Sequence, residues 1–559
     1  MKKFFQFIRA ESPEFRTRLV VISVAAGILN GYAVSLAIQA AKRLEPGQLQ
    51  IREFLLFFIS LAAFWLSKEY VLNRTTNIVE GIIRNIRMRI MRSVRTTGLL
   101  VFERMNRGRI YSVLSNDALT LSVSSGAIIN ASSSACMLIF VIANIGFHSV
   151  WALGITLLFV SGAVYLYIRK SHTVNAELAA ATRLENDFFE NLNGLIHGYK
   201  ELKLSRARAD DFFSADLWEI ITRTADLRTK AGKTMNQSVL IGQTFLLFTI
   251  AGVLFLLPNL QPGDVAVIGP VVAIVLFAAG PIGDVVVAIP ALARAGAAID
   301  NINNLERDLK QNQNEIEIYA ETQPLHEEPF TSLACHGLSF AYPPSPGNGP
   351  HGFQLEPFDF SLRAGEIVFI VGGNGSGKST FLRLLTALYP PANGRLIWND
   401  REVTPDRLAS YRNLFTPIFS DFHIFKRILG VPNIDEDHVR MLIARMDLTG
   451  KTDIANRRLT NIDLSSGQKK RLALILAQLD NRPIFVFDEW AADQDPVFRR
   501  FFYTQLLPEM KRQGHTILAV THDDQYFSCA DRVLKMEYGR FLPGEHHAKA
   551  FDEDASSAS

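Results

Sequence analysis

Long uncharged stretches alternate with polar stretches over the first 300 residues of the chain. The first of them, residues 19–41, has the ~20 apolar residues that a helix needs to cross a bilayer, and it is too long for the core of a signal peptide. Lys68 and Glu69 interrupt the second stretch, which makes it the least regular. The pattern predicts an all-α transmembrane domain over residues 1–300, with six spans near 19–41, 54–73, 120–147, 149–168, 237–257 and 265–289.

The connections between the predicted spans differ in length and charge. Those between spans two and three and between spans four and five are long and rich in Arg and Lys, whereas residues 146–149 and 258–262 are short turns without either. Because Lys and Arg concentrate on the cytoplasmic side, the long connections and both termini are predicted to be cytoplasmic. Apolar residues at helical spacing among the arginines, such as Ile82 and Ile86, predict that the spans continue as helices beyond the bilayer.

Composition narrows the classes of protein that fit. Only 20% of the 559 residues are charged, against a typical ~25%, which agrees with a chain that lies partly in a membrane. The net charge is +3, so no polyanion-binding surface is indicated and nucleic acid is not an expected partner. The cysteines stand far apart in the chain, which excludes a disulfide framework or a zinc cluster. Three ionisable residues lie at or near predicted spans, where they face either a water-filled cavity or cytoplasmic water: Lys68, Glu69 and Asp284.

A phosphate-binding motif lies beyond the membrane domain. After a polar segment predicted as a linker over 301–331, the apolar run 366–371 has the length of a strand and opens into a Gly-rich loop and a helix-prone segment. In such a P-loop the backbone N–H groups surround phosphate, the lysine reaches the β- and γ-phosphates, and the serine hydroxyl binds Mg²⁺. The loop consists of Gly372, Gly373, Asn374, Gly375, Ser376, Gly377, Lys378, Ser379 and Thr380.

Two acidic residues follow a second apolar run, 484–487, which is typical of a buried parallel strand. A nucleotide hydrolase needs one acid to hold the metal ion and another group to orient water. The pattern predicts that Asp488 holds Mg²⁺, together with Ser379, and that Glu489 polarises the attacking water.

The order of motifs resembles the nucleotide-binding domain of ABC transporters. The family's signature LSGGQ stands here as Leu464 followed by Ser465, Ser466, Gly467 and Gln468. The resemblance implies that Tyr342 stacks on adenine, that the switch histidine His522 contacts the γ-phosphate, and that Asp495 belongs to the D-loop. One motif departs from the family: Ser420 stands where the Q-loop glutamine is expected, which leaves its contact with metal or water in doubt.

The resemblance also implies an architecture. The chain is expected to be a half-transporter: a six-helix transmembrane domain of ABC exporter type, followed by an α/β P-loop ATPase domain over 332–545 and a disordered tail over 546–559. In the family, two ATP molecules with Mg²⁺ lie between two ATPase domains, so a homodimer in the lipid bilayer is expected. The fusion of membrane domain ahead of ATPase domain is typical of exporters.

Three segments, around 419–422, 488–496 and 194–204, resemble the bacterial cyclic-peptide and siderophore exporters of the syringomycin and pyoverdine secretion type. The expected function is export of a modified or cyclic peptide, a siderophore or its precursor across the bacterial inner membrane. Periplasmic or outer-membrane export components are candidate partners. The alternatives are a multidrug or lipid exporter and a membrane sensor that hydrolyses ATP without moving a solute. The short segment before residue 19 argues against an exporter that cleaves leader peptides.

Overall fold

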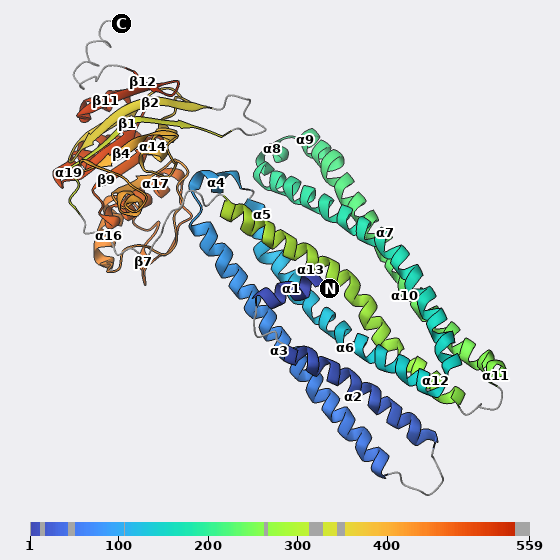
Figure 1. The fold of residues 1–559 in the computed structure, drawn as a ribbon. Coiled ribbons are helices and arrows are strands. Elements are labelled where there is room, and N and C mark those ends of the chain that lie inside the picture. The colour runs from blue at the N-terminus through green and yellow to red at the C-terminus, as the bar shows by residue number, and fades with distance from the viewer. Residues whose placement is uncertain are drawn as a thin grey trace. The chain divides into compact units, whose positions relative to one another are not determined.

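The computed structural model describes residues 2–11, 17–42, 51–105, 107–261, 267–311, 328–343 and 353–542. The tail predicted over 546–559 lies outside these residues. The chain divides into two compact units (Figure 1). One unit comprises Met1–Met91 and Asn106–Asp308, and the other comprises Arg92–Met105 and Leu309–Ser559. We refer to them as the membrane unit and the ATPase unit.

The membrane unit is built from helices, several of which are far longer than a bilayer is thick. At 1.5 Å per residue, the 45 residues of α3 extend over about 68 Å, so the helical continuation predicted for the spans is present. π-Helical turns join some helices, at Val113–Asp117 and Phe212–Leu217. The helices are α1 (Lys2–Glu11), α2 (Thr17–Lys42), α3 (Ile51–Arg95), α5 (Arg107–Ser112), α6 (Ala118–His148), α7 (Val150–His197), α8 (Tyr199–Leu204), α9 (Arg206–Asp211), α10 (Trp218–Phe255), α11 (Leu257–Leu260), α12 (Ile268–Phe277) and α13 (Ala279–Gln311).

Six helical segments of the described chain are long and apolar enough to cross a membrane. Each overlaps one of the predicted spans, including the irregular second one, which lies within α3. The polar segment 301–331, predicted as a linker, begins as the last turns of α13, because that helix continues to Gln311. The spans are Val21–Ala40, Ile51–Arg95, Gly108–His148, Val150–His197, Arg206–Phe255 and Ile268–Lys310.

Small residues allow the long helices to pack closely. The helices α7 and α10 lie side by side along much of their length, and α2 packs on α6 (Figure 1). A Cβ atom at Gly252 would lie 2.8 Å from Ile155 Cγ2, and one at Gly27 would lie 2.9 Å from the Ser133 carbonyl oxygen. Glycine at such crossings lets two backbones approach where a larger side chain would separate the helices.

The ATPase unit contains a six-stranded sheet in the order β12-β11-β3-β10-β9-β6, parallel except for β12, and a four-stranded antiparallel sheet in the order β2-β1-β4-β5. Its helices and strands are α4 (Leu99–Arg104), β1 (Ser332–Ala341), β2 (Gln354–Arg363), β3 (Ile367–Val371), α14 (Lys378–Leu385), β4 (Asn393–Trp398), β5 (Arg401–Glu402), α15 (Leu408–Arg412), β6 (Phe415–Ile418), α16 (Glu436–Arg445), β7 (Ile454–Ala455), β8 (Arg458–Leu459), α17 (Ser466–Asp480), β9 (Ile484–Asp488), α18 (Pro496–Phe501), α19 (Leu507–Arg512), β10 (Thr516–Val520), β11 (Arg532–Glu537) and β12 (Arg540–Phe541).

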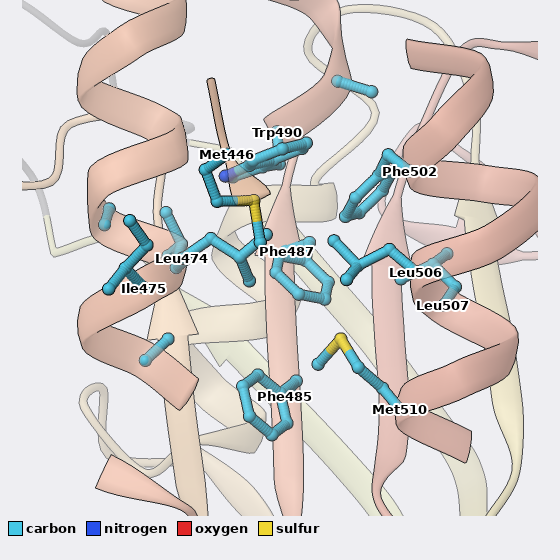
Figure 2. Packing of buried hydrophobic residues seen from close by; sticks show 14 of the residues in the cluster. Met446, Leu474, Ile475, Phe485, Phe487, Trp490, Phe502, Leu506, Leu507 and Met510 are labelled. Carbon is cyan, nitrogen blue, oxygen red and sulfur yellow. The ribbon is translucent and has the colours of Figure 1, made fainter. Parts of the chain in front are cut away.

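Helices cover the parallel sheet, so its central strands are apolar on both faces. All five residues of β3, β9 and β10 are buried. Figure 2 shows Phe485 and Phe487 of β9 packed between α17 on one side and the helix that carries Leu506 and Met510 on the other. Such packing leaves the ends of the strands as the places where polar side chains can meet.

The short helix α4 belongs to the ATPase unit although it precedes most of the membrane unit in sequence. Leu100 is buried in the core between the two sheets. Glu103 Oε2 accepts a hydrogen bond of 2.5 Å from the Tyr389 hydroxyl, and Arg383 lies 3.4 Å from the same carboxylate. These contacts fix α4, which follows α3 in sequence, within the ATPase unit.

Candidate functional site

The Gly-rich loop connects β3 to α14, and at two of its positions the backbone conformation is one that only glycine permits. Gly372 has φ +150°, and a Cβ there would lie 2.1 Å from the Met536 carbonyl oxygen; Gly377 has φ +106°, and a Cβ there would lie 2.7 Å from the Phe353 ring. Residues 373–375 are exposed. The Ser376 hydroxyl is buried and has no hydrogen-bond partner among the described residues. An open loop with an unpartnered buried hydroxyl suits an anionic ligand such as phosphate.

Lys378, the first residue of α14, is almost completely buried. Its ammonium group donates to the carbonyl oxygens of Gly372 at 2.8 Å and Gly373 at 2.9 Å. Burial lowers the pKa of Lys378, and the carboxylates of Glu489 and Asp488 oppose that shift. The ammonium group of Lys378 is therefore held against the backbone of the loop at the N-terminus of α14. Phosphate is attracted there by both the positive charge and the helix N-terminus.

Asp488, the last residue of β9, lies beside two hydroxyl groups. Ser379 Oγ donates to one carboxylate oxygen at 3.2 Å, and Ser420 Oγ donates to the other at 3.4 Å. Burial raises the pKa of Asp488, while the hydrogen bond from Ser379 lowers it. Carboxylate and hydroxyl oxygens are the hard ligands that Mg²⁺ prefers, so this donor set fits the predicted ion.

Glu489 and His522 face each other across the ends of neighbouring parallel strands. Glu489 follows β9 and His522 follows β10, and these strands pair in register up to Val520 opposite Asp488. His522 Nε2 lies 3.2 Å from Glu489 Oε1. Since β3 also pairs with β10, the P-loop, the two acids and the histidine converge on one edge of the sheet.

The signature residues form the beginning of α17. The Ser465 hydroxyl accepts from the Gln468 backbone N–H while the Gln468 side chain accepts from the Ser465 N–H, which completes a capping box. Ser465 and Ser466 are exposed, so serine fits where the family has glycine. Gly467 cannot change in the same way, because a Cβ there would lie 2.6 Å from the Asp493 carbonyl oxygen. In the described part of the chain, no hydrogen bond links these residues to the P-loop of the same chain.

Asp495 and Tyr342 have structural contacts of their own. Asp495 accepts from the Phe498 backbone N–H at 2.9 Å, which caps α18, and that bond lowers its pKa. The Tyr342 hydroxyl lies 3.2 Å from Thr380 Oγ1, just after the P-loop, and its ring meets Phe340 edge to face. Tyr342 is only half-buried, so one part of the ring remains accessible beside the loop.

Sequence reasoning missed several charged residues that the structure places around this edge. In α17, Lys470 binds the Glu489 carbonyl and Arg471 binds Asp495 at 2.5 Å. In α14, Arg383 lies between Glu103 and Asp421, at 3.4 and 3.3 Å. The run of three basic residues after the signature was a signal, because basic side chains on one buried helix face need acidic partners.

The arrangement can bind a nucleoside triphosphate and hydrolyse it. The loop and Lys378 supply positive charge for phosphates, and Ser379 and Asp488 supply ligands for a divalent cation. Glu489 supplies a carboxylate that can orient water, and His522 supplies a polar group beside it. Ser420 extends the polar set but has a shorter reach than glutamine.

A family model described as ABC transporter matches residues 355–492. The ATP-binding protein SyrD of Pseudomonas syringae pv. syringae is 33% identical over 472 residues, which cover 82% of each chain. The ATP-dependent lipid A-core flippase of Ralstonia nicotianae is 29% identical over 222 residues, or 37% of each chain. Among solved structures, a bacterial Atm1-family ABC exporter with ATP bound has the same fold, with a TM-score of 0.68 and 17% identity over 97% of each chain.

Proposed function

Since the chain belongs to the ABC transporter family and couples ATP hydrolysis to transport across a membrane, we propose that it exports a modified or cyclic peptide, a siderophore or a siderophore precursor. The observation that carries this proposal is the length of the similarity to SyrD. A match of 472 residues extends well beyond the ATPase domain and includes much of the membrane unit, where cargo passes. The similarity to the lipid A-core flippase covers only 222 residues.

We assign the following roles in hydrolysis. Lys378 and the loop 372–377 bind the phosphates of ATP, Ser379 and Asp488 hold Mg²⁺, and Tyr342 stacks on adenine. When bound, Mg²⁺ neutralises charge on the phosphates. Glu489 orients the attacking water and His522 contacts the γ-phosphate.

The working unit in this proposal is a homodimer in the bilayer. The exposed residues Ser465 and Ser466, with Gly467, Gln468 and Asp495 behind them, would close over the nucleotide of the second copy. This explains why the signature makes no hydrogen bond to its own P-loop in the described chain. The protein is a multi-pass membrane protein. We place it in the bacterial inner membrane with both termini in the cytoplasm.

Polar contacts between the spans support a pathway of mixed polarity, as an amphipathic cargo needs. Ser134 Oγ of α6 donates to Asp284 of α13 at 2.6 Å, and Asn144 of α6 donates to Ser35 of α2 at 3.2 Å. Polar groups inside a membrane are costly, and their presence commonly marks the route of a solute.

A transport assay tests the cargo. Inside-out membrane vesicles that contain the protein should accumulate labelled cyclic peptide or siderophore when ATP is present, and vesicles with Glu489→Gln should not. Deletion of the gene should shift secreted peptides from medium to cells. Unchanged peptide secretion with an altered lipid or drug phenotype would indicate a lipid or multidrug exporter instead, a candidate that the similarity to the flippase favours. ATPase activity without uptake of any solute would indicate a sensor.

A further inference from the structure

Lys470 lies one turn into α17, and its side chain is only 7% exposed. Its ammonium group donates to the Glu489 carbonyl oxygen at 2.8 Å and pairs with Asp493 Oδ2 at 2.8 Å. The backbone carbonyl of Lys470 in turn accepts from Trp490 Nε1 at 2.9 Å. One buried lysine therefore contacts the residue proposed to orient water, the next residue and the loop that follows.

The backbone of Glu489 needs such support. Its φ of +51° and ψ of +38° lie in the left-handed region, which is strained for any residue with a side chain. Three hydrogen bonds hold this conformation: the Glu489 N–H donates to the Val520 carbonyl at 3.1 Å, and the Glu489 carbonyl accepts from Lys470 at 2.8 Å and, more weakly, from the Ala492 N–H at 3.3 Å. The first bond comes from β10 and the second from α17, so the peptide groups on both sides of the Glu489 α-carbon are anchored.

The direction of the Glu489 side chain depends on this conformation. A turn to right-handed φ and ψ would rotate the Cα–Cβ bond and move the carboxylate away from His522 Nε2, which it meets at 3.2 Å. Trp490 is fixed by stacking on Phe502, with 4.3 Å between ring centroids, so it resists movement of the chain after Glu489. Lys470 is the charged contact on the carbonyl side.

We propose that Lys470 is a positioning residue for hydrolysis, which holds the Glu489 backbone in the left-handed conformation that directs its carboxylate to the attacking water. Among the described residues, no hydrogen bond or ion pair links Lys470 to the P-loop or to the pair Ser379 and Asp488. Its loss should therefore reduce the rate of hydrolysis without a matching loss of ATP binding. The proposal rests on the catalytic role proposed above for Glu489, and it does not depend on the cargo.

The test uses the full-length protein in nanodiscs. Lys470→Met keeps most of the stem and removes the ammonium group, and Lys470→Arg retains a charged donor. Lys469→Met is the matched control, since it changes the neighbouring lysine of the same helix, which is partly exposed. We expect kcat for ATP to fall at least tenfold in Lys470→Met, with KM and the affinity for a fluorescent ATP analogue within twofold. Lys470→Arg should recover most of kcat, and Lys469→Met should leave it unchanged.

A double-mutant cycle separates positioning from general loss of structure. In single-turnover assays, Lys470→Met should add little to the defect of Glu489→Gln, because a misdirected glutamine loses nothing further. If Lys470→Met folds poorly, Lys470→Met combined with Asp493→Asn removes both charges of the ion pair and should show the same loss of kcat in folded protein. An unchanged kcat, or an equal loss in the Glu489→Gln background, would overturn the proposal for Lys470 alone. Normal hydrolysis by Glu489→Gln would instead overturn the catalytic role of Glu489, and the proposal with it.

Discussion

The catalytic edge of the ATPase unit and the spans of the membrane unit hold polar groups in different ways. At the catalytic edge, single side chains have several partners: Asp488 meets two hydroxyl groups, and Lys378 meets two carbonyl oxygens. In the apolar parts of the spans, polar groups meet in pairs, such as Ser134 with Asp284, whereas Arg89 near the polar end of α3 pairs with both Glu11 and Glu306. Between 11% and 39% of each span's most apolar window is buried within the chain, so most residues of these windows are at least partly exposed in the single chain.

This difference predicts how strongly the function depends on single residues in each unit. A network on rigid, buried strand ends depends on each member, because the removal of one leaves the others misdirected or unpaired. On the partly exposed helix faces of the spans, in contrast, binding of a cargo would be divided among many weak contacts. Single substitutions should therefore have large effects on ATP hydrolysis and small effects in the membrane unit.

The largest effect is expected from Glu489→Gln. General base catalysis contributes about 10²- to 10⁴-fold, so ATP turnover should fall by that factor while ATP still binds. Glu509→Gln is a suitable control, because Glu509 is paired with Arg445 on another part of the ATPase unit. Steady-state phosphate release and binding of a fluorescent ATP analogue measure the two quantities. ATP turnover within a few-fold of that of the unmodified protein would contradict the proposed role of Glu489 in orienting water.

Lys378→Ala should come next. Hydrogen bonds to charged groups contribute about 1.5–3 kcal/mol, so ATP affinity should weaken about 10- to 100-fold. Arg395→Ala, which removes an exposed cation of β4, should leave affinity unchanged. Titration with the fluorescent ATP analogue measures the affinity of each variant. Equal affinities for the two variants would contradict the role of Lys378.

The sequence was sufficient to predict features that depend on neighbouring residues. The P-loop follows from a strand, a glycine pattern and a helix between residues 367 and 385, and each span follows from one largely apolar stretch. Asp488 and Glu489 were predictable because the apolar run 484–487 indicates a strand covered on both faces, and polar groups of a site then lie at the end of that strand. The overall architecture, six spans followed by an ABC ATPase domain, was confirmed by the fold and the comparisons.

Contacts between distant parts of the chain were not predictable. Glu103 and Tyr389 are 286 residues apart, and no local pattern connects them. The Arg-rich segment before α4 was predicted to continue the second span as a helix, and it does so as far as Arg95. No local pattern indicated that the next short helix packs into the ATPase core. Lys470 was not recognised from the sequence as a functional residue, because its partners Glu489 and Asp493 lie in the segment that follows the buried part of β9.

Glu103→Gln tests the contact that fixes α4, the short helix after the second span, within the ATPase unit. Substitutions along such connections change coupling by about 0.5–2 kcal/mol, so the ratio of cargo-stimulated to basal ATPase activity should fall about 2- to 30-fold. Basal activity should change less. Because Arg383 meets the same carboxylate at 3.4 Å, Arg383→Gln should give a similar loss, and the double variant should be no worse than either single variant. Additive losses would show that the two residues act separately.

The smallest effect is expected in the spans. Ser134→Ala removes the hydrogen bond between α6 and α13, and such bonds between membrane helices average about 0.6 kcal/mol. Asp284 is only partly buried, so water or another polar group can replace the lost donor at little cost. The free energy of unfolding in mixed micelles should fall by about that amount, with kcat for ATP unchanged. Ser132→Ala is the matched control, because the Ser132 hydroxyl donates to the Ile128 carbonyl of its own helix at 2.9 Å and makes no hydrogen bond to another helix of the described chain. A loss of unfolding free energy several times larger in Ser134→Ala, or a clear fall in kcat, would show that a single contact between spans matters as much as one at the catalytic edge. The contrast between the two units would then no longer hold.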